Sequence, residues 1–172
     1  MALTSAQAAW FLLAALPISL YVAYTDMKSL KIPNVAVYAL VAGFAVLGLI
    51  ALPFADYLWR WTHLVVVLLI GMVANLVRLV GAGDAKFAAA AAPMIALPDL
   101  GLMAYIAAAT FIVAYVAHRM AKHSPLRRLV PDWASWTSGK RFPMGLALGA
   151  ALVGYLVLGL LQTPQPSLPG LT

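Results

Sequence analysis

Two aspartates lie in short polar stretches that interrupt long apolar runs. Asp84 lies in the stretch 81–86, of sequence GAGDAK, and Asp26 follows the first apolar run. An ionisable group beside hydrocarbon is costly and marks a functional site by default. Two carboxylates about 3 Å apart cannot both ionise, so one proton is shared between them. The ionised acid can then activate water while the protonated acid polarises a carbonyl, which predicts an aspartyl protease dyad of Asp26 and Asp84.

Gly81 and Gly83 flank this chemistry. Without side chains they let the chain leave a helix in unusual φ/ψ and let a substrate backbone approach the acid closely. The alternative is that Gly-Ala-Gly is an ordinary turn between helices and Asp84 a solvated loop acid. Loop chemistry by itself leaves both interpretations open.

The remaining titratable residues offer few substitutes. The chain has five Asp and no Glu. Asp56 and Asp99 are expected on the opposite membrane face, which leaves Asp132 as the only serious substitute for a member of the dyad. The chain has no cysteine, and its three histidines (His63, His118 and His123) are scattered near the ends of apolar runs. We therefore predict no metal site and no cofactor.

The composition is that of a polytopic membrane protein. Hydrophobic residues make up 65% of the chain and charged residues only 9%, whereas a soluble domain carries about a quarter charged residues. The net charge of +6 would suit nucleic acid, but the basic residues fall at the ends of apolar runs. Membrane topology explains them better, and no nucleic acid partner is predicted.

The apolar runs predict spanning helices of about 20 residues each. Four single runs are expected to cross once, and the aromatic stretch 53–63 is expected to be an interfacial loop. The run 85–117 is too long for one comfortable crossing and has turn chemistry at 97–101, so it is expected to form a hairpin of two helices. The four single runs are 8–24, 34–52, 63–80 and 142–161.

The basic residues orient these helices. With the hairpin, every Lys and Arg except Arg60 falls on the cytoplasmic side, whereas a single helix would move the basic block 119–141 outside. We therefore expect an all-α integral membrane protein of about six transmembrane helices, with both termini outside. It would be one domain over 1–172 with a flexible tail at 162–172, and the basic segment 118–142 would lie on anionic headgroups.

Three motifs resemble those of the type IV prepilin peptidase family. Residues 26–34 (DMKSLKIPN) resemble its aspartate, basic residues and Ile-Pro-Asn pattern, and residues 81–87 (GAGDAKF) resemble its Gly-x-Gly-Asp motif. Residues 142–147 (FPMGLA) resemble the run that opens its last helix, with Met144 where an aromatic is more usual. The short chain, without a cysteine-containing N-terminal extension, resembles the minimal branch that serves tight-adherence (Flp-type) pili.

The resemblance implies a membrane aspartic endopeptidase that removes a short basic leader from prepilins at the cytoplasmic face of the bacterial inner membrane. Asp26 and Asp84 would be catalytic, and the substrate would be a membrane helix held in a groove of the first, third and fourth helices. No methyltransferase activity is expected. The alternatives are a presenilin-like protease with deeper acids, and a non-enzymatic scaffold or transporter subunit. Gly81, Gly83, Lys86, Lys28, Pro33 and Asn34 would support the loops or the substrate.

Four polar residues near the dyad have competing interpretations. Lys86 is expected either to steer the substrate or tune Asp84, or to anchor the chain at the cytoplasmic face. Lys28 is interpreted mainly as a topology signal. Asn75 is expected to form an interhelical hydrogen bond, and Arg78 to snorkel to the interface.

Overall fold

Helices make up the architecture of the computed structural model, which describes residues 1–139 and 141–162. The described residues contain no strand, so the predicted all-α class is confirmed. The α-helices are α1 (Ser5–Ser29), α2 (Asn34–Ala51), α3 (Phe54–Leu76), α4 (Ala82–Ala91), α5 (Leu100–Lys122), α6 (Ala134–Thr137) and α7 (Met144–Leu160). Short 3-10 turns are η1 (Ala92–Met94), η2 (Leu97–Asp99) and η3 (Pro125–Leu129). The flexible tail predicted at 162–172 lies outside the described residues, except for Gln162.

Four helices are long and apolar enough to cross a membrane: α1, α2, α3 and the η2–α5 segment from Leu97 to Lys122. Helix α7 is also apolar, but with 17 residues it is one residue shorter than α2, the shortest of these four. Helix α4 has only 10 residues. At about 1.5 Å per residue, α4 is about 15 Å long, half the hydrocarbon core. A membrane protein is therefore established, while six crossings and the orientation of the termini stay predictions.

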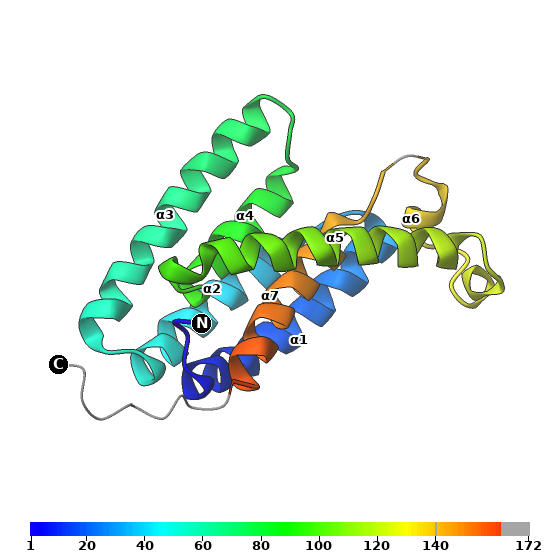
Figure 1. The fold of residues 1–172 in the computed structure, drawn as a ribbon. Helices are drawn as coiled ribbons and strands as arrows, with labels where there is room; N and C mark the ends of the chain where they lie inside the picture. The colour runs from blue at the N-terminus through cyan, green and yellow to red at the C-terminus, as the bar shows by residue number, and fades with distance from the viewer. Residues whose placement is uncertain (140, 163–172) are drawn as a thin grey trace.

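The hairpin predicted within 85–117 is visible as a break in the helix. Pro93 and Pro98 interrupt it, because proline removes a backbone donor and clashes with the preceding turn. The chain reverses between α4 and α5 at η1 and η2 (Figure 1). Residues 92–96 and Asp99 of this irregular stretch are buried, whereas Leu97 and Pro98 are exposed.

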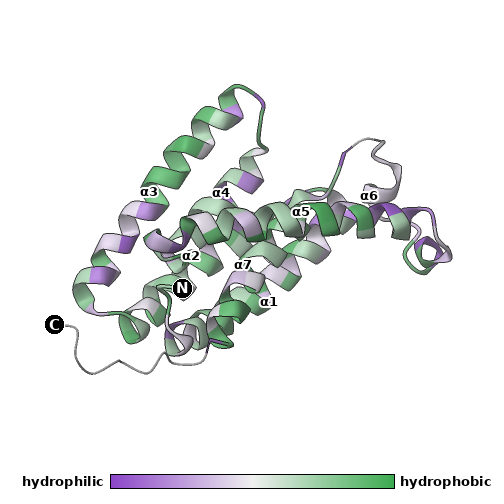
Figure 2. Ribbon diagram, in the orientation of Figure 1, coloured by the Kyte–Doolittle hydropathy of each residue, from purple (hydrophilic) through white to green (hydrophobic). Residues whose placement is uncertain are grey.

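The core of the molecule lies between α1, α2, α4 and α7. Helices α1 and α7 run side by side, and α4 is enclosed by its neighbours, with Phe87 and Ala90 almost fully buried. Helix α3 contacts mainly α4 and η1 and leans away from the rest of the bundle (Figure 1). Its middle carries hydrophobic residues, with polar residues nearer its ends (Figure 2).

The predicted aromatic loop at 53–63 is wrong, because α3 already begins at Phe54. Pro53 caps this helix, and Tyr57 and Trp61, one turn apart, both pack on Phe44 of α2 at ring distances of 5.5 and 5.2 Å. Aromatic residues that suggested an interface thus serve helix packing. Helix α3 also ends earlier than predicted, at Leu76.

The segment 118–142 departs in part from the predicted surface segment. Helix α5 continues to Lys122, so His118 is helical and buried. Trp136 is also buried and stacks on His118 at a ring distance of 5.3 Å. Met120, Leu126 and Leu129 remain exposed, so these residues of the segment offer apolar side chains to a headgroup layer. Binding to anionic headgroups stays a prediction.

Candidate active site

Asp26 and Asp84 line the same cavity, although 58 positions separate them in sequence. The cavity has a volume of about 840 Å³ and is formed by the end of α1, the loop before α2, the α3–α4 turn and the start of α7. The charge of Asp84 acts on Asp26 across this space. The structure therefore brings together the two acids that the sequence analysis paired.

Asp26 lies in the last turn of α1 and is 5% exposed. The backbone N–H of Gly145, at the start of α7, donates to its Oδ2 atom at 2.6 Å. A Cβ at position 145 would lie 3.0 Å from that same oxygen and 2.9 Å from Val22 Cγ1. Only glycine lets α7 approach α1 closely enough to make this hydrogen bond without displacing the carboxylate.

Asp84 lies in the first turn of α4, whereas the sequence analysis placed it just before that helix. Its carboxylate lies over Gly81, which caps the helix, and a Cβ on Gly81 would be only 2.6 Å from Oδ2. Burial raises the pKa of Asp84 above its usual value, and a hydrogen bond with the Gly81 backbone opposes that rise. Each acid therefore has a glycine partner that supplies a backbone contact and leaves room for the carboxylate.

The two motif loops are held against each other. Lys86 Nζ donates to Asn34 Oδ1 at 3.2 Å, and a Cβ on Gly83 would lie 3.3 Å from Ile32 Cβ. Asn34 opens α2 behind Pro33, which caps that helix. Lys86 thus joins the start of α2 to the helix that carries Asp84.

Other predicted residues are placed differently. Lys28 Nζ lies over the ring of Tyr24, 5.6 Å from the ring centroid. Lys28 does not line the cavity. Asn75 donates to Val80 O at 2.8 Å and so caps the α3–α4 turn, which corrects the predicted interhelical hydrogen bond. Arg78 lines the cavity from this turn in a left-handed conformation, with φ of 61°.

The acids set aside by the sequence analysis lie away from the cavity. Asp56 and Asp132 are exposed, whereas Asp99 is buried and accepts hydrogen bonds from Tyr155 Oη at 2.9 Å and from the backbone N–H groups of Ala2 and Leu3. Asp99 therefore has a structural position. Among residues 1–139 and 141–162, no group of three or more His or acidic side chains could hold a metal ion.

Gly145 is the site residue that the sequence analysis quoted without assigning it a role. Small residues recur every fourth or fifth position along the last apolar run, as Gly145, Gly149 and Gly154. Such spacing is typical of closely packed membrane helices and would have predicted a tight contact. It does not identify α1 as the partner or Asp26 as the acceptor. Lys31 and Arg141, which line the cavity with Arg78, were interpreted from the sequence only as signals of membrane topology.

Comparison with known proteins supplies a family. Residues 11–117 match the sequence model of the type IV leader peptidase family, which is an aspartic protease family. The matched range includes both acids of the cavity and ends before residues 142–147. No curated protein and no solved structure matches the chain.

Proposed function

We propose that this chain, which belongs to the type IV leader peptidase family, is a membrane aspartic endopeptidase that removes the leader peptide of Flp-type prepilins at the cytoplasmic membrane face. The observation that carries the proposal is the shared cavity of Asp26 and Asp84, each acid lying against a glycine backbone. The family supports a prepilin-type peptidase activity. The choice of an Flp-type prepilin as the substrate is part of the proposal.

The two carboxylates would act as a pair that holds one proton between them. The ionised acid takes a proton from water as the water oxygen attacks the scissile carbonyl carbon, while the protonated acid donates to the carbonyl oxygen. Collapse of the tetrahedral intermediate breaks the C–N bond, and the departing amine receives a proton from the acid that had accepted one. Both apparent pKa values of such a pair belong to the pair as a whole.

The charge distribution supports a cytoplasmic active site. Lys31, Arg78 and Arg141 line the cavity, and Arg60 lies on α3 away from it. Cytoplasmic loops of membrane proteins carry an excess of Lys and Arg. The same argument supports placement of both termini on the outer side of the bacterial inner membrane.

The position of the acids at helix ends favours this function over a presenilin-like protease. Asp26 occupies the last turn of α1 and Asp84 the first turn of α4, and both adjoin polar loops at the open cavity. A peptide bond just outside the hydrocarbon would reach water and acids there. A scaffold or transporter subunit would need no such pairing of acids with a peptide-sized cavity.

The proposal is tested by substituting each acid in the purified protein. Asp26→Asn and Asp84→Asn should each reduce cleavage of an Flp-type prepilin at its leader junction by at least about 100-fold, because neither half of a dyad works alone. Asp132→Asn, at an exposed acid outside the cavity, should retain activity. Gel shift and mass spectrometry report the cleavage, and the new N-terminus should carry no methyl group.

Size-exclusion elution of each variant controls for loss of the fold. Full activity in either Asn variant of the pair would contradict the dyad. Loss of activity in Asp132→Asn alone would show that the partner is wrongly assigned.

A further inference from the structure

An apolar groove extends from the candidate active site along α3 and α4. It consists of two hollows of about 290 and 540 Å³, both lined almost wholly by apolar side chains. Val67, Ile70 and Ala88 line both hollows, so the two are continuous. We call this continuous feature the α3–α4 groove.

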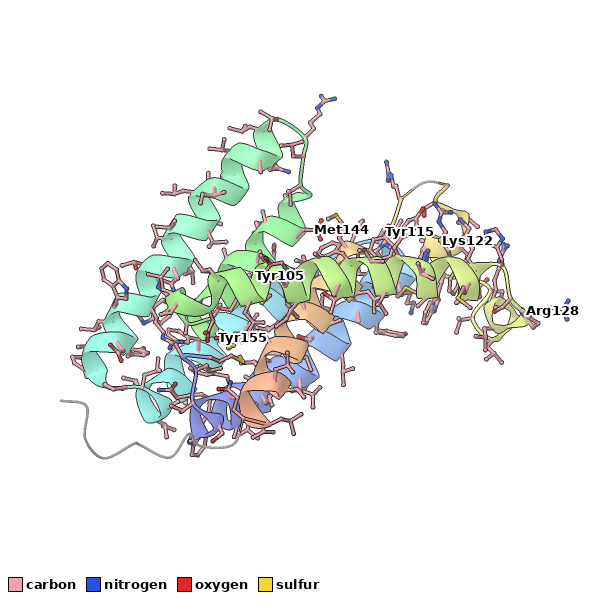
Figure 3. The ribbon with its side chains drawn as sticks, viewed as in Figure 1. Tyr105, Tyr115, Lys122, Arg128, Met144 and Tyr155 are labelled. Atoms are coloured by element: carbon pink, nitrogen blue, oxygen red, sulfur yellow. The ribbon has the colours of Figure 1, made fainter. Side chains whose placement is uncertain are left out.

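The groove joins the polar cavity at Asp84. Val80, Asp84 and Met144 line both the cavity and the nearer hollow of the groove. Figure 3 shows Met144 beside the start of α4. The lining therefore changes at Asp84 from polar and cationic on one side to hydrocarbon on the other. A bound chain would need the same change of polarity at the same point.

The walls of the groove differ from those expected for the substrate site. Helix α3 forms one side and α4 the floor, while Phe111 of α5 and Leu148 of α7 close the other side near Asp84. Helix α1 contributes no residue to either hollow, whereas the expected substrate groove was formed by the first, third and fourth helices. Helix α3 leans away from α5 and α7 (Figure 1).

The groove is longer than a single acyl chain. Its lining on α3 extends from Trp59 to Ala74, which at about 1.5 Å per residue is about 22 Å. The hydrocarbon core is about 30 Å thick, so an acyl chain from one leaflet covers only about 15 Å. An apolar helix inserted across the membrane would cover the whole groove.

We infer that the α3–α4 groove holds the apolar transmembrane helix of the substrate, with the first residues after the cleaved bond beside Asp84. This inference rests on the proposed peptidase function for the position of the bond. The docking itself requires only the groove. A substrate would be selected by having its polar-to-apolar junction at the scissile bond, and it would enter from the bilayer between α3 and α5.

Disulfide trapping tests the docking without requiring catalysis. The chain has no cysteine, so single cysteines can be introduced cleanly. Ala88→Cys lies on the groove floor, and Ala109→Cys lies on the exposed surface of α5 and lines neither hollow. In nanodiscs containing an Flp-type prepilin with a single cysteine midway along its apolar helix, Ala88→Cys should form at least about 10-fold more cross-link than Ala109→Cys. Equal yields from the two positions would overturn the docking.

Blocking the groove tests its use in turnover. Ala88→Trp should lower cleavage of the membrane-inserted prepilin by at least about 10-fold, while a soluble peptide that spans only the leader junction is cleaved within about twofold of the unsubstituted protein. Ala109→Trp should leave both rates unchanged. If Ala88→Trp disturbs the fold, it lowers both rates equally. In that case Ile70→Trp, at an exposed position of the groove, is the test variant, and Leu69→Trp on the same helix is its control.

The outcomes separate the two proposals. Unchanged cleavage of the inserted prepilin in both Ala88→Trp and Ile70→Trp would overturn the docking and leave the peptidase function standing. If the unsubstituted protein cleaves neither substrate and Ala88→Cys still cross-links selectively, the peptidase function fails while the docking holds. Filling of the groove by lipid alone would appear as equal cross-linking at the groove and control positions.

Discussion

Each acid of the candidate dyad lies against a glycine, and the geometry explains why a glycine is needed at these two positions. Gly81 and Gly145 belong to different helices, yet a Cβ at either position would meet the carboxylate oxygen that the glycine accommodates. Sequence reasoning attributed Gly81 to the approach of substrate. The structure adds that the carboxylate of Asp84 itself occupies the space a side chain would need.

Gly81→Ala should therefore displace the Asp84 carboxylate and lower prepilin cleavage by at least about 10-fold. The nearest atom to the added Cβ would be Asp84 Oδ2, at 2.6 Å, so the effect should fall on catalysis more than on folding. Gly101→Ala is the matched control, because its Cβ would have no neighbour within 4 Å. Initial cleavage rates and thermal unfolding in detergent measure the two effects. Equal activity of the two variants would contradict the assigned role of Gly81.

The site could be predicted from the sequence where chemistry is local. The resemblance of two short motifs, Gly-x-Gly-Asp and the loop with Ile-Pro-Asn, predicted Asp84 and Asp26 as site residues. The hydrogen bond from Gly145 to Asp26 could not be predicted, because its partners are 119 positions apart and meet only through the packing of α7 on α1. The contact of Lys86 with Asn34 likewise depends on how two loops meet.

Among the elements, the C-terminal end of α4 and the start of α5 are fixed by a buried polar cluster. Asp99 ends η2 and accepts hydrogen bonds from Tyr155 of α7 and from the segment before α1. Arg60 of α3 is buried nearby and donates to Pro93 O at 3.2 Å. This cluster connects four parts of the chain at the end opposite the carboxylates. The sequence analysis predicted the turn here from Pro98 and Gly101, but the hydrogen-bond partners of Asp99 are distant in sequence.

Asp99→Ala should destabilise the protein by about 2–4 kcal/mol, because buried donors lose a charged acceptor. For a chain of this size that corresponds to a fall of roughly 5–15 °C in the unfolding temperature. Thermal unfolding in detergent measures the fall, and Asp56→Ala, at an exposed acid, should change the temperature little. Cleavage per folded molecule should stay within about twofold of the unsubstituted protein. A loss of cleavage without a loss of stability would instead give Asp99 a role in the reaction.

At the scale of the whole molecule, the bundle has two chemically different ends. The end that carries the cavity contains Asp26 and Asp84 with Lys31, Arg78 and Arg141, and the other end contains the Asp99 cluster with Arg60. Helix α7 runs between them, since Gly145 lies against Asp26 and Gly159 lies against Ala8 near the start of α1. The apolar runs and the basic residues predicted Asp26 and Asp84 at one end and Asp99 at the other, whereas the early start of α3 and the shortness of α4 depended on tertiary packing that no local pattern reports.

The asymmetry of the ends makes the orientation testable. If the cavity faces the cytoplasm, a reporter inserted after Lys122, in the segment beyond α5, should be cytoplasmic, and a reporter at Thr172 should be outside. The reason is that α5 ends near Phe142 at the cavity end, through the contact of His118 with that ring at 5.7 Å, while α7 carries the chain back to the opposite end. Paired alkaline phosphatase and fluorescent protein fusions at both positions measure the sides. Reporters on the same side would mean that α7, with only 17 residues, does not cross the membrane, and the helix count would have to be reduced.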